Sequence, residues 1–130
     1  MLENKLRVLI AEDNLVNVEL LQMVLMRWGY ESCAAYNGEE VLAALKGGRY
    51  DLIFMDIRMP GLDGIGATQA IMERYPPGER PVIVAMTGYV MQSERDRCIA
   101  AGMDDFIGKP FEFDEVRRVL QDCENNRLSS

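Results

Sequence analysis

Hydrophobic residues fall into short unbroken runs along this chain, separated by longer stretches in which apolar positions recur with a helical period. The runs lie at residues 7–11, 52–55 and 82–86, with weaker candidates at 31–35 and 105–107. Unbroken apolar runs of this length are typical of parallel strands that are covered on both faces. The pattern therefore predicts five strands of a largely buried sheet.

A stretch with helical spacing follows each run. These stretches lie at residues 15–28, 39–46, 64–74, 92–101 and 112–123. Asn14 is suited to cap the first helix, and Gly29 and Gly102 are suited to helix ends. The order is strand–helix repeated five times, and right-handed crossovers then favour an α/β fold with a doubly wound parallel sheet. We expect one domain over residues 1–125 and a short tail at 126–130.

Polar residues stand where the predicted strands end. Glu12 and Asp13 follow the first run, Asp56 the third, Thr87 the fourth and Lys109 the fifth. In open parallel sheets, ligands bind beyond the carboxyl ends of the strands. Any one of these residues could simply belong to a polar loop, but together they form a chemically coherent set of three carboxylates, one hydroxyl and one lysine.

This set is suited to phosphoryl transfer. Three crowded carboxylates repel one another and need a cation, and a site with only oxygen ligands suits Mg²⁺. Asp56 can accept a phosphoryl group covalently, while Lys109 and Thr87 supply a positive charge and a hydroxyl donor to its oxygens. Phosphoryl transfer depends mainly on positioning and charge stabilisation, so these residues suffice.

Four segments resemble the receiver domains of two-component signalling: AEDN (11–14), FMDIRMPGLDG (54–64), AMTG (85–88) and AAGMDDFIGKPF (100–111). The resemblance covers nearly the whole chain and implies a flavodoxin-like strand order of 2-1-3-4-5. It also implies phosphorylation of Asp56, and binding of Mg²⁺ by Asp56, Glu12, Asp13 and the backbone carbonyl of Arg58.

By the same resemblance, Thr87 and Lys109 bind the phosphoryl group, and Phe106 is an aromatic switch that moves when Thr87 does. Such a domain catalyses only its own phosphorylation and dephosphorylation and is otherwise not an enzyme. The chain departs mildly from the family, because many relatives have Asp in place of Glu12 and Tyr in place of Phe106. Without the Tyr hydroxyl, one hydrogen bond of the active state is lost.

Two further roles are hypotheses. Arg58 and Tyr89 each lie two residues after a site residue and are large enough to shield the phosphoryl group from water. In the first helix, the spacing predicts an inward face that includes Leu20. It leaves Leu15, Val18 and Met26 on an outer stripe, which in receivers of this lineage docks against a histidine phosphotransfer domain.

Composition limits the partners. The net charge is −7 and there is no histidine, so we expect no direct binding to nucleic acid, and the phosphohistidine donor must be another protein. We expect that donor to be a histidine kinase or a histidine phosphotransfer domain. The resemblance also admits a homodimer through the fourth helix, fifth strand and fifth helix.

Location follows from the cysteines and the apolar runs. Three scattered cysteines favour a reducing compartment. No apolar run approaches the roughly 18 residues of a membrane span, and we expect neither membrane insertion nor a signal peptide. We therefore expect a cytoplasmic protein, which is either a stand-alone receiver or the receiver of a hybrid, membrane-bound histidine kinase. The segment AEDNLVN (11–17) favours the hybrid-kinase lineage.

Two other functions fit parts of the sequence. A phosphatase of the haloacid dehalogenase type also uses an aspartate at a strand end, but it would carry a second carboxylate where this chain has Arg58. A receiver fold that has lost phosphorylation would serve as a fixed interaction module. The complete set of acidic, hydroxyl and lysine residues argues against that alternative.

Overall fold

The computed structural model describes residues 6–88 and 91–129, with side chains to residue 125. Five parallel strands form one sheet in the order β2-β1-β3-β4-β5, which confirms the predicted fold. The strands are β1 (Val8–Ala11), β2 (Ser32–Ala35), β3 (Leu52–Asp56), β4 (Val82–Thr87) and β5 (Asp105–Gly108).

Five α-helices connect and follow the strands: α1 (Leu15–Arg27), α2 (Gly38–Gly47), α3 (Gly64–Arg74), α4 (Gln92–Ala101) and α5 (Phe113–Ser129). A 3₁₀-helix at Pro77–Glu79 lies between α3 and β4. Asn14 caps α1 by accepting a hydrogen bond from the N–H of Asn17, as predicted, and Asn37 and Asp63 cap α2 and α3 in the same way.

Helix α5 runs further than expected and reaches Ser129. The division into a receiver domain at 1–125 and a tail at 126–130 stays a prediction. No helix in the described part of the chain has both the length and the apolar composition that crossing a bilayer requires.

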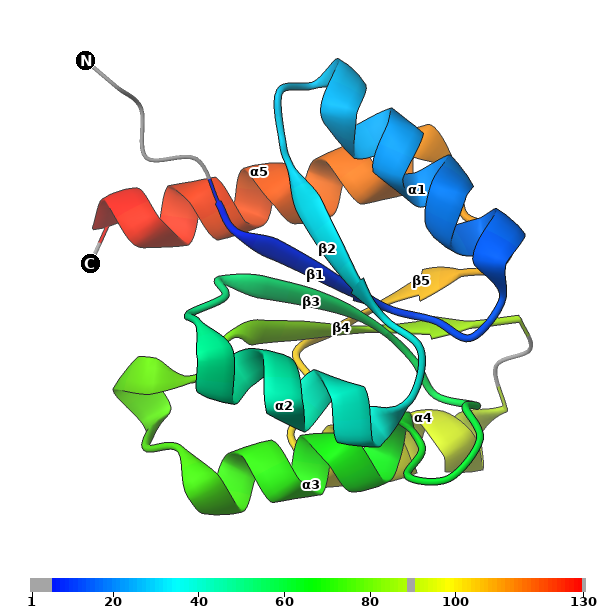
Figure 1. Cartoon of the computed structure of the whole chain (residues 1–130), viewed down its shortest axis with the longest axis vertical. Coiled ribbons are helices and arrows are strands. Elements are labelled where there is room, and N and C mark those ends of the chain that lie inside the picture. The colour runs from blue at the N-terminus through cyan, green and yellow to red at the C-terminus, as the bar shows by residue number, and fades with distance from the viewer. Residues whose placement is uncertain (1–5, 89–90, 130) are drawn as a thin grey trace.

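Both faces of the sheet are covered, which explains the unbroken apolar runs. Helices α1 and α5 lie on one face, and α2, α3 and α4 lie on the other (Figure 1). Alternate residues of a strand point to opposite faces, so Ile53 joins the cluster under α2, α3 and α4 while Phe54 joins the one under α1 and α5. Two apolar cores therefore hold the strands in register.

The parallel register brings the ends of four strands to one edge. Ala11 pairs with Met55 between β1 and β3, Asp56 with Met86 between β3 and β4, and Thr87 with Gly108 between β4 and β5. The loops that follow these four strands therefore lie at the same edge of the sheet.

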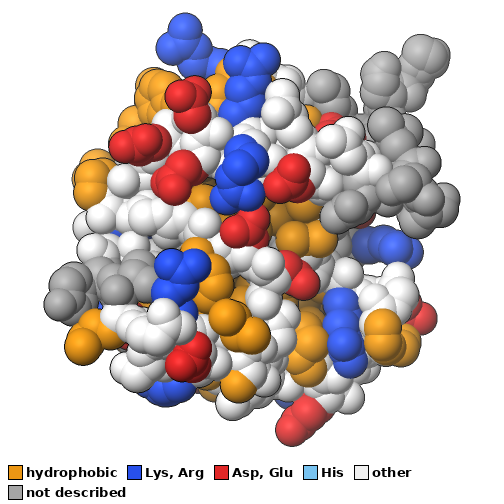
Figure 2. Space-filling model, turned by 180° about the vertical axis from the view of Figure 1, so that it is seen from behind, with side chains coloured by type: hydrophobic (Ala, Val, Ile, Leu, Met, Phe, Trp, Pro, Cys, Tyr) orange, Lys and Arg blue, Asp and Glu red, His pale blue; other side chains and the backbone are white. Residues whose placement is uncertain are grey.

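The reverse side of the molecule shows acidic and basic side chains interspersed, with no large area of one sign (Figure 2). On the β5–α5 surface, Arg118 pairs with Asp105 at 2.9 Å and with Asp122 at 3.2 Å. The two carboxylates raise the pKa of Arg118. Burial alone would raise the pKa of Asp105, but the guanidinium of Arg118 acts in the opposite direction, and the pKa of Asp105 is lowered. These three charges of the β5–α5 surface are thus paired with one another.

Candidate functional site

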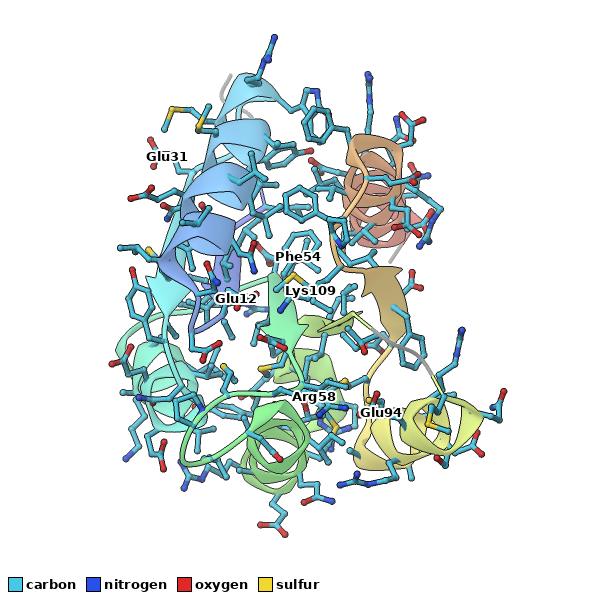
Figure 3. The ribbon with its side chains drawn as sticks, turned by 90° about the vertical axis from the view of Figure 1, so that its right-hand side faces the viewer. Glu12, Glu31, Phe54, Arg58, Glu94 and Lys109 are labelled. Atoms are coloured by element: carbon cyan, nitrogen blue, oxygen red, sulfur yellow. The ribbon has the colours of Figure 1, made fainter. Side chains whose placement is uncertain are left out.

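The predicted site residues come together at the carboxyl edge of the sheet, which faces the viewer in Figure 3. Glu12 follows β1 and is only 1% exposed, Asp56 ends β3 at 4%, and Thr87 ends β4 at 6%. Asp13 is exposed, and Lys109 follows β5 and is half-buried. These five residues line an open cavity of about 520 Å³. The strand-end prediction of their positions is therefore correct.

Lys109 bridges two of the carboxylates. Its Nζ lies 3.0 Å from Oε1 of Glu12 and 3.1 Å from Oδ2 of Asp56. Only the second contact has the geometry of a hydrogen bond, and Oε1 of Glu12 accepts no hydrogen bond within the described residues. Burial lowers the pKa of Lys109, but the two carboxylates outweigh it and the pKa is raised above its usual value. Lys109 is thus held in its charged form.

Backbone groups orient the other carboxylate oxygens. The N–H of Asn14 donates to Oε2 of Glu12 at 3.0 Å, and the N–H of Arg58 donates to Oδ1 of Asp56 at 3.0 Å. A Cβ at Gly64 would collide with the backbone carbonyl of Asp56, so only glycine lets α3 begin so close to β3. Sequence reasoning missed this role of Gly64, although a glycine directly after the capping Asp63 was a signal for it.

The acidic residues fit a divalent cation. One oxygen from each of Glu12, Asp13 and Asp56 lies within 4.8 Å of the others. Three carboxylates against the single ammonium of Lys109 leave a surplus of two negative charges. Oε1 of Glu12 is buried and contacts the ammonium of Lys109 without hydrogen-bond geometry, so it keeps acceptor capacity for a cation. Oxygen ligands of this kind suit Mg²⁺.

Arg58 has its side chain directed to α4. Its guanidinium lies 3.1 Å from Oε2 of Glu94 (Figure 3). The structure therefore places this side chain in an ion pair with Glu94, and a shielding position over the site would require it to leave that pair. Tyr89, the other residue expected to shield the phosphoryl group, lies outside the described residues.

Phe106 lies on β5 and is half-buried. The guanidinium of Arg95 from α4 covers its ring at 4.6 Å from the centroid. Sequence reasoning missed both Glu94 and Arg95, because neither stands at a strand end or in a motif. Their roles depend on where α4 packs, which a helical pattern alone does not show.

The predicted outer stripe of α1 is partly wrong. Leu15 and Met26 are exposed, at 56% and 69%, but Val18 is 1% exposed and packs in the core under α1 and α5. Leu20, expected inside, is 43% exposed. Apolar residues surround almost the whole helix, so the spacing could not distinguish the inward face. The exposed apolar face of α1 consists of Leu15, Val16, Leu20, Met23 and Met26.

Comparisons with known proteins agree on one family. The model of the response regulator receiver domain matches residues 8–121. Histidine protein kinase 1 of Candida albicans is 41% identical over 124 residues, which cover 88% of this chain and 5% of that kinase. The chain spans about a twentieth of the length of the first curated relatives that it matches.

Two solved structures extend the likeness. The receiver domain of a sensor histidine kinase from Pseudomonas aeruginosa, with magnesium coordinated in its active-site cleft, is 36% identical with a TM-score of 0.82 and covers 92% of this chain and 97% of its own. The receiver domain of the Saccharomyces cerevisiae response regulator Ssk1, in complex with the histidine phosphotransfer protein Ypd1, is 28% identical with a TM-score of 0.82, covering 92% and 89%.

Proposed function

The chain belongs to the response regulator receiver domain family, and from that premise we propose that it accepts a phosphoryl group on Asp56 from a phosphohistidine donor. It is a signalling domain of two-component phosphorelays. The observation that carries the choice of Asp56 is its position: it ends the central strand β3, within 3.1 Å of Lys109 and in reach of Glu12 and Asp13.

The transfer is a displacement at phosphorus. A carboxylate oxygen of Asp56 attacks, the bond from phosphorus to the donor's histidine nitrogen breaks, and the imidazole, protonated on its other ring nitrogen, leaves as the neutral base with the bonding electrons. Lys109 is already placed at Oδ2 of Asp56 and can follow the new phosphoryl oxygens, while Thr87 can donate its hydroxyl to them. No residue of this chain has to act as a base, because a carboxylate nucleophile has no proton to give up in the attack.

Glu12, Asp13, Asp56 and the backbone carbonyl of Arg58 would hold Mg²⁺ at this site. When bound, the cation neutralises the surplus negative charge that would otherwise repel an incoming phosphoryl group. Asp13 is exposed and therefore free to turn toward the cation, whereas Glu12 is held by the N–H of Asn14. We assign Asp13 the more direct contact for this reason.

Thr87 and Phe106 form the proposed switch. Once Thr87 moves toward the phosphoryl group, the space behind it becomes open to the ring of Phe106, which lies on the neighbouring strand. The surface formed by α4, β5 and α5 would then change, and a partner could distinguish the two states. The domain would later lose the phosphoryl group by its own hydrolysis, which Arg58 and Tyr89 would slow by covering it.

The donor would be a histidine kinase or a histidine phosphotransfer domain. Support comes from the histidine kinases among the relatives and from the phosphotransfer complex of the Ssk1 receiver. The exposed apolar face of α1 begins directly after the site at Leu15 and is the proposed docking surface. A homodimer through α4, β5 and α5 stays a proposal, as does a cytoplasmic location within a longer hybrid kinase.

The proposal is tested by labelling with a small donor. The protein is incubated with acetyl phosphate and Mg²⁺, and base-labile phosphate is located by peptide mass spectrometry. We expect the label on the peptide that carries Asp56, loss of the label in Asp56→Asn, and undiminished labelling in Asp122→Asn, an exposed aspartate of α5. Full labelling of Asp56→Asn would refute the assignment.

A further inference from the structure

Helix α4 is weakly anchored in the fold. Of its ten residues, Cys98 and Ala101 are buried. The side chain of its N-cap residue, Met91, makes no capping hydrogen bond, whereas α1, α2 and α3 each begin with a capping side chain. The first turn of α4 therefore depends on other contacts to stay in place.

Two consecutive residues of that first turn supply such contacts. Glu94 Oε2 lies 3.1 Å from the guanidinium of Arg58, in the loop after β3. Arg95 covers the ring of Phe106 on β5. Figure 3 shows Arg58 and Glu94 pointing toward one another between the β3–α3 loop and α4. The first turn is thus joined to both sides of the phosphorylation site.

Arg58 stands between two anionic sites. Its backbone N–H already donates to Oδ1 of Asp56, so its side chain is attached to the loop that holds the acceptor. Its partner Glu94 offers one negative charge, whereas a phosphoryl group on Asp56 would offer close to two, on three acceptor oxygens. The side chain of Arg58 is 76% exposed, and ion pairs of this kind are weak enough to exchange partners.

We propose that the Arg58–Glu94 ion pair is a phosphate-sensitive tether, which holds the first turn of α4 against the β3–α3 loop until Arg58 leaves Glu94 for the phosphoryl group on Asp56. The release step rests on the proposed phosphorylation of Asp56. The tether links the site to α4 by a path separate from Thr87 and Phe106. It also reconciles the shielding role expected of Arg58 with its place on Glu94, because the released guanidinium is the one that covers the phosphoryl group.

The native cysteines report on α4 without any introduced probe. Cys98 lies on the buried side of α4 and is 1% exposed, Cys123 is buried in α5, and Cys33 on β2 is exposed. Alkylation by iodoacetamide, followed for each cysteine by peptide mass spectrometry, therefore measures the opening of α4 at Cys98. Cys123 reports global unfolding, and Cys33 serves as an exposed internal reference for the reagent.

The first arm of the experiment uses unphosphorylated protein. Glu94→Gln and Arg58→Met should each raise the alkylation rate of Cys98 about two- to fivefold, the size expected for loss of an exposed ion pair. Both variants are needed, because burial and, after it, the charge of Glu94 raise the pKa of Cys98, and only Arg58→Met retains that carboxylate. Asp96→Asn makes the same charge change on α4 away from Arg58 and should leave the rate unchanged.

The second arm adds acetyl phosphate and Mg²⁺. Cys98 of the wild type should become more reactive as Asp56 is labelled, with no rise in Asp56→Asn and no further rise in Arg58→Met. If Cys98 of unphosphorylated Glu94→Gln and Arg58→Met were alkylated no faster than Cys98 of Asp96→Asn, the tether would be overturned. An unchanged Cys98 rate in labelled wild type would overturn the release step. Absence of phosphate on Asp56 would instead refute the proposed function and, with it, the release step. Whether the ion pair holds α4 in the unphosphorylated protein is tested by the first arm alone.

Discussion

The ammonium of Lys109 lies 3.1 Å from Oδ2 of Asp56. The proposed phosphoryl acceptor therefore carries its own counter-charge before any donor or cation arrives. That charge has two consequences: it stabilises buried carboxylates in the resting protein, and it is in place for the oxygens of an incoming phosphoryl group.

Lys109→Met should destabilise the metal-free protein by roughly 1–3 kcal/mol, because Glu12 and Asp56 are buried and would lose their cationic partner. Mg²⁺ should recover part of this loss by replacing the missing charge. Urea unfolding followed by far-UV circular dichroism, with and without Mg²⁺, measures both effects. Lys46→Met, which removes an exposed lysine of α2, is the matched control. Equal losses in the two variants would contradict the role given to Lys109.

Asp13→Asn should have the opposite effect on stability. Asp13 is exposed and adds repulsion to the other two carboxylates, so its neutralisation should stabilise the metal-free fold by up to about 1 kcal/mol. Glu12→Gln should lower stability instead, because it weakens the contact with Lys109. The same titrations should show that Asp13→Asn has lost the stabilisation by Mg²⁺ and labelling by acetyl phosphate. A less stable but fully labelled Asp13→Asn protein would be incompatible with this account of the acidic cluster.

Tyr30 should make the fold sensitive to alkaline pH. Its hydroxyl donates to Oε2 of Glu124 at 2.6 Å, and burial together with that carboxylate raises the pKa of Tyr30 from 10.0 to about 12. The unfolded chain loses this proton near pH 10 and the folded chain keeps it, so the stabilisation is complete below pH 10 and is lost as pH rises toward 12.

Tyr30→Phe should therefore lower the free energy of unfolding by about 1 kcal/mol at neutral pH. Between pH 10 and 12 the free energy of unfolding of the variant should fall less steeply than that of the wild type. The difference between wild type and variant isolates Tyr30 from Lys109, whose pKa is also raised and which titrates equally in both proteins. If the free energies of unfolding of the wild type and the variant fell in parallel across this pH range, the pKa of the Tyr30 hydroxyl would not be raised by folding.

The strand ends were predictable because two independent patterns coincide there. An unbroken apolar run ends where the covered part of the sheet ends, and parallel strands end at one edge, so Asp56 and Thr87 could be placed together from the sequence alone. Element bounds followed the same signals, and the α3 and α4 ranges agree with those predicted.

Side-chain direction was not predictable to the same degree. Val18 was misplaced because α1 is apolar around nearly its whole circumference, and the three-dimensional packing of α1 against β1 and α5 decides its inward face. The Arg58–Glu94 pair depends on the position of α4, a helix whose own sequence has almost no apolar face. Contacts between distant loops and helices are set by packing, which local patterns do not encode.

The exposed apolar face of α1 predicts where the protein donor docks. Five exposed apolar side chains on one helix next to the site exceed what scattered surface residues account for. Leu15 and Leu20 lie in the first two turns of α1, which begins directly after the site residues Glu12 and Asp13, so helix packing there would bring the donor histidine toward the acceptor.

Leu15→Ala with Leu20→Ala should slow transfer from a phosphorylated histidine phosphotransfer domain about tenfold, the effect of removing two apolar contacts from an interface. Labelling by acetyl phosphate should stay near the wild-type rate, because that small donor needs no docking surface. Ile99→Ala, which truncates an exposed apolar residue of α4, serves as the control and should leave both rates unchanged. Both rates are read from the phosphorylated fraction by intact-mass spectrometry. An equal loss with the two donors would mean that the substitutions damage the site, and an unchanged rate with the protein donor would exclude this face of α1 as the docking surface.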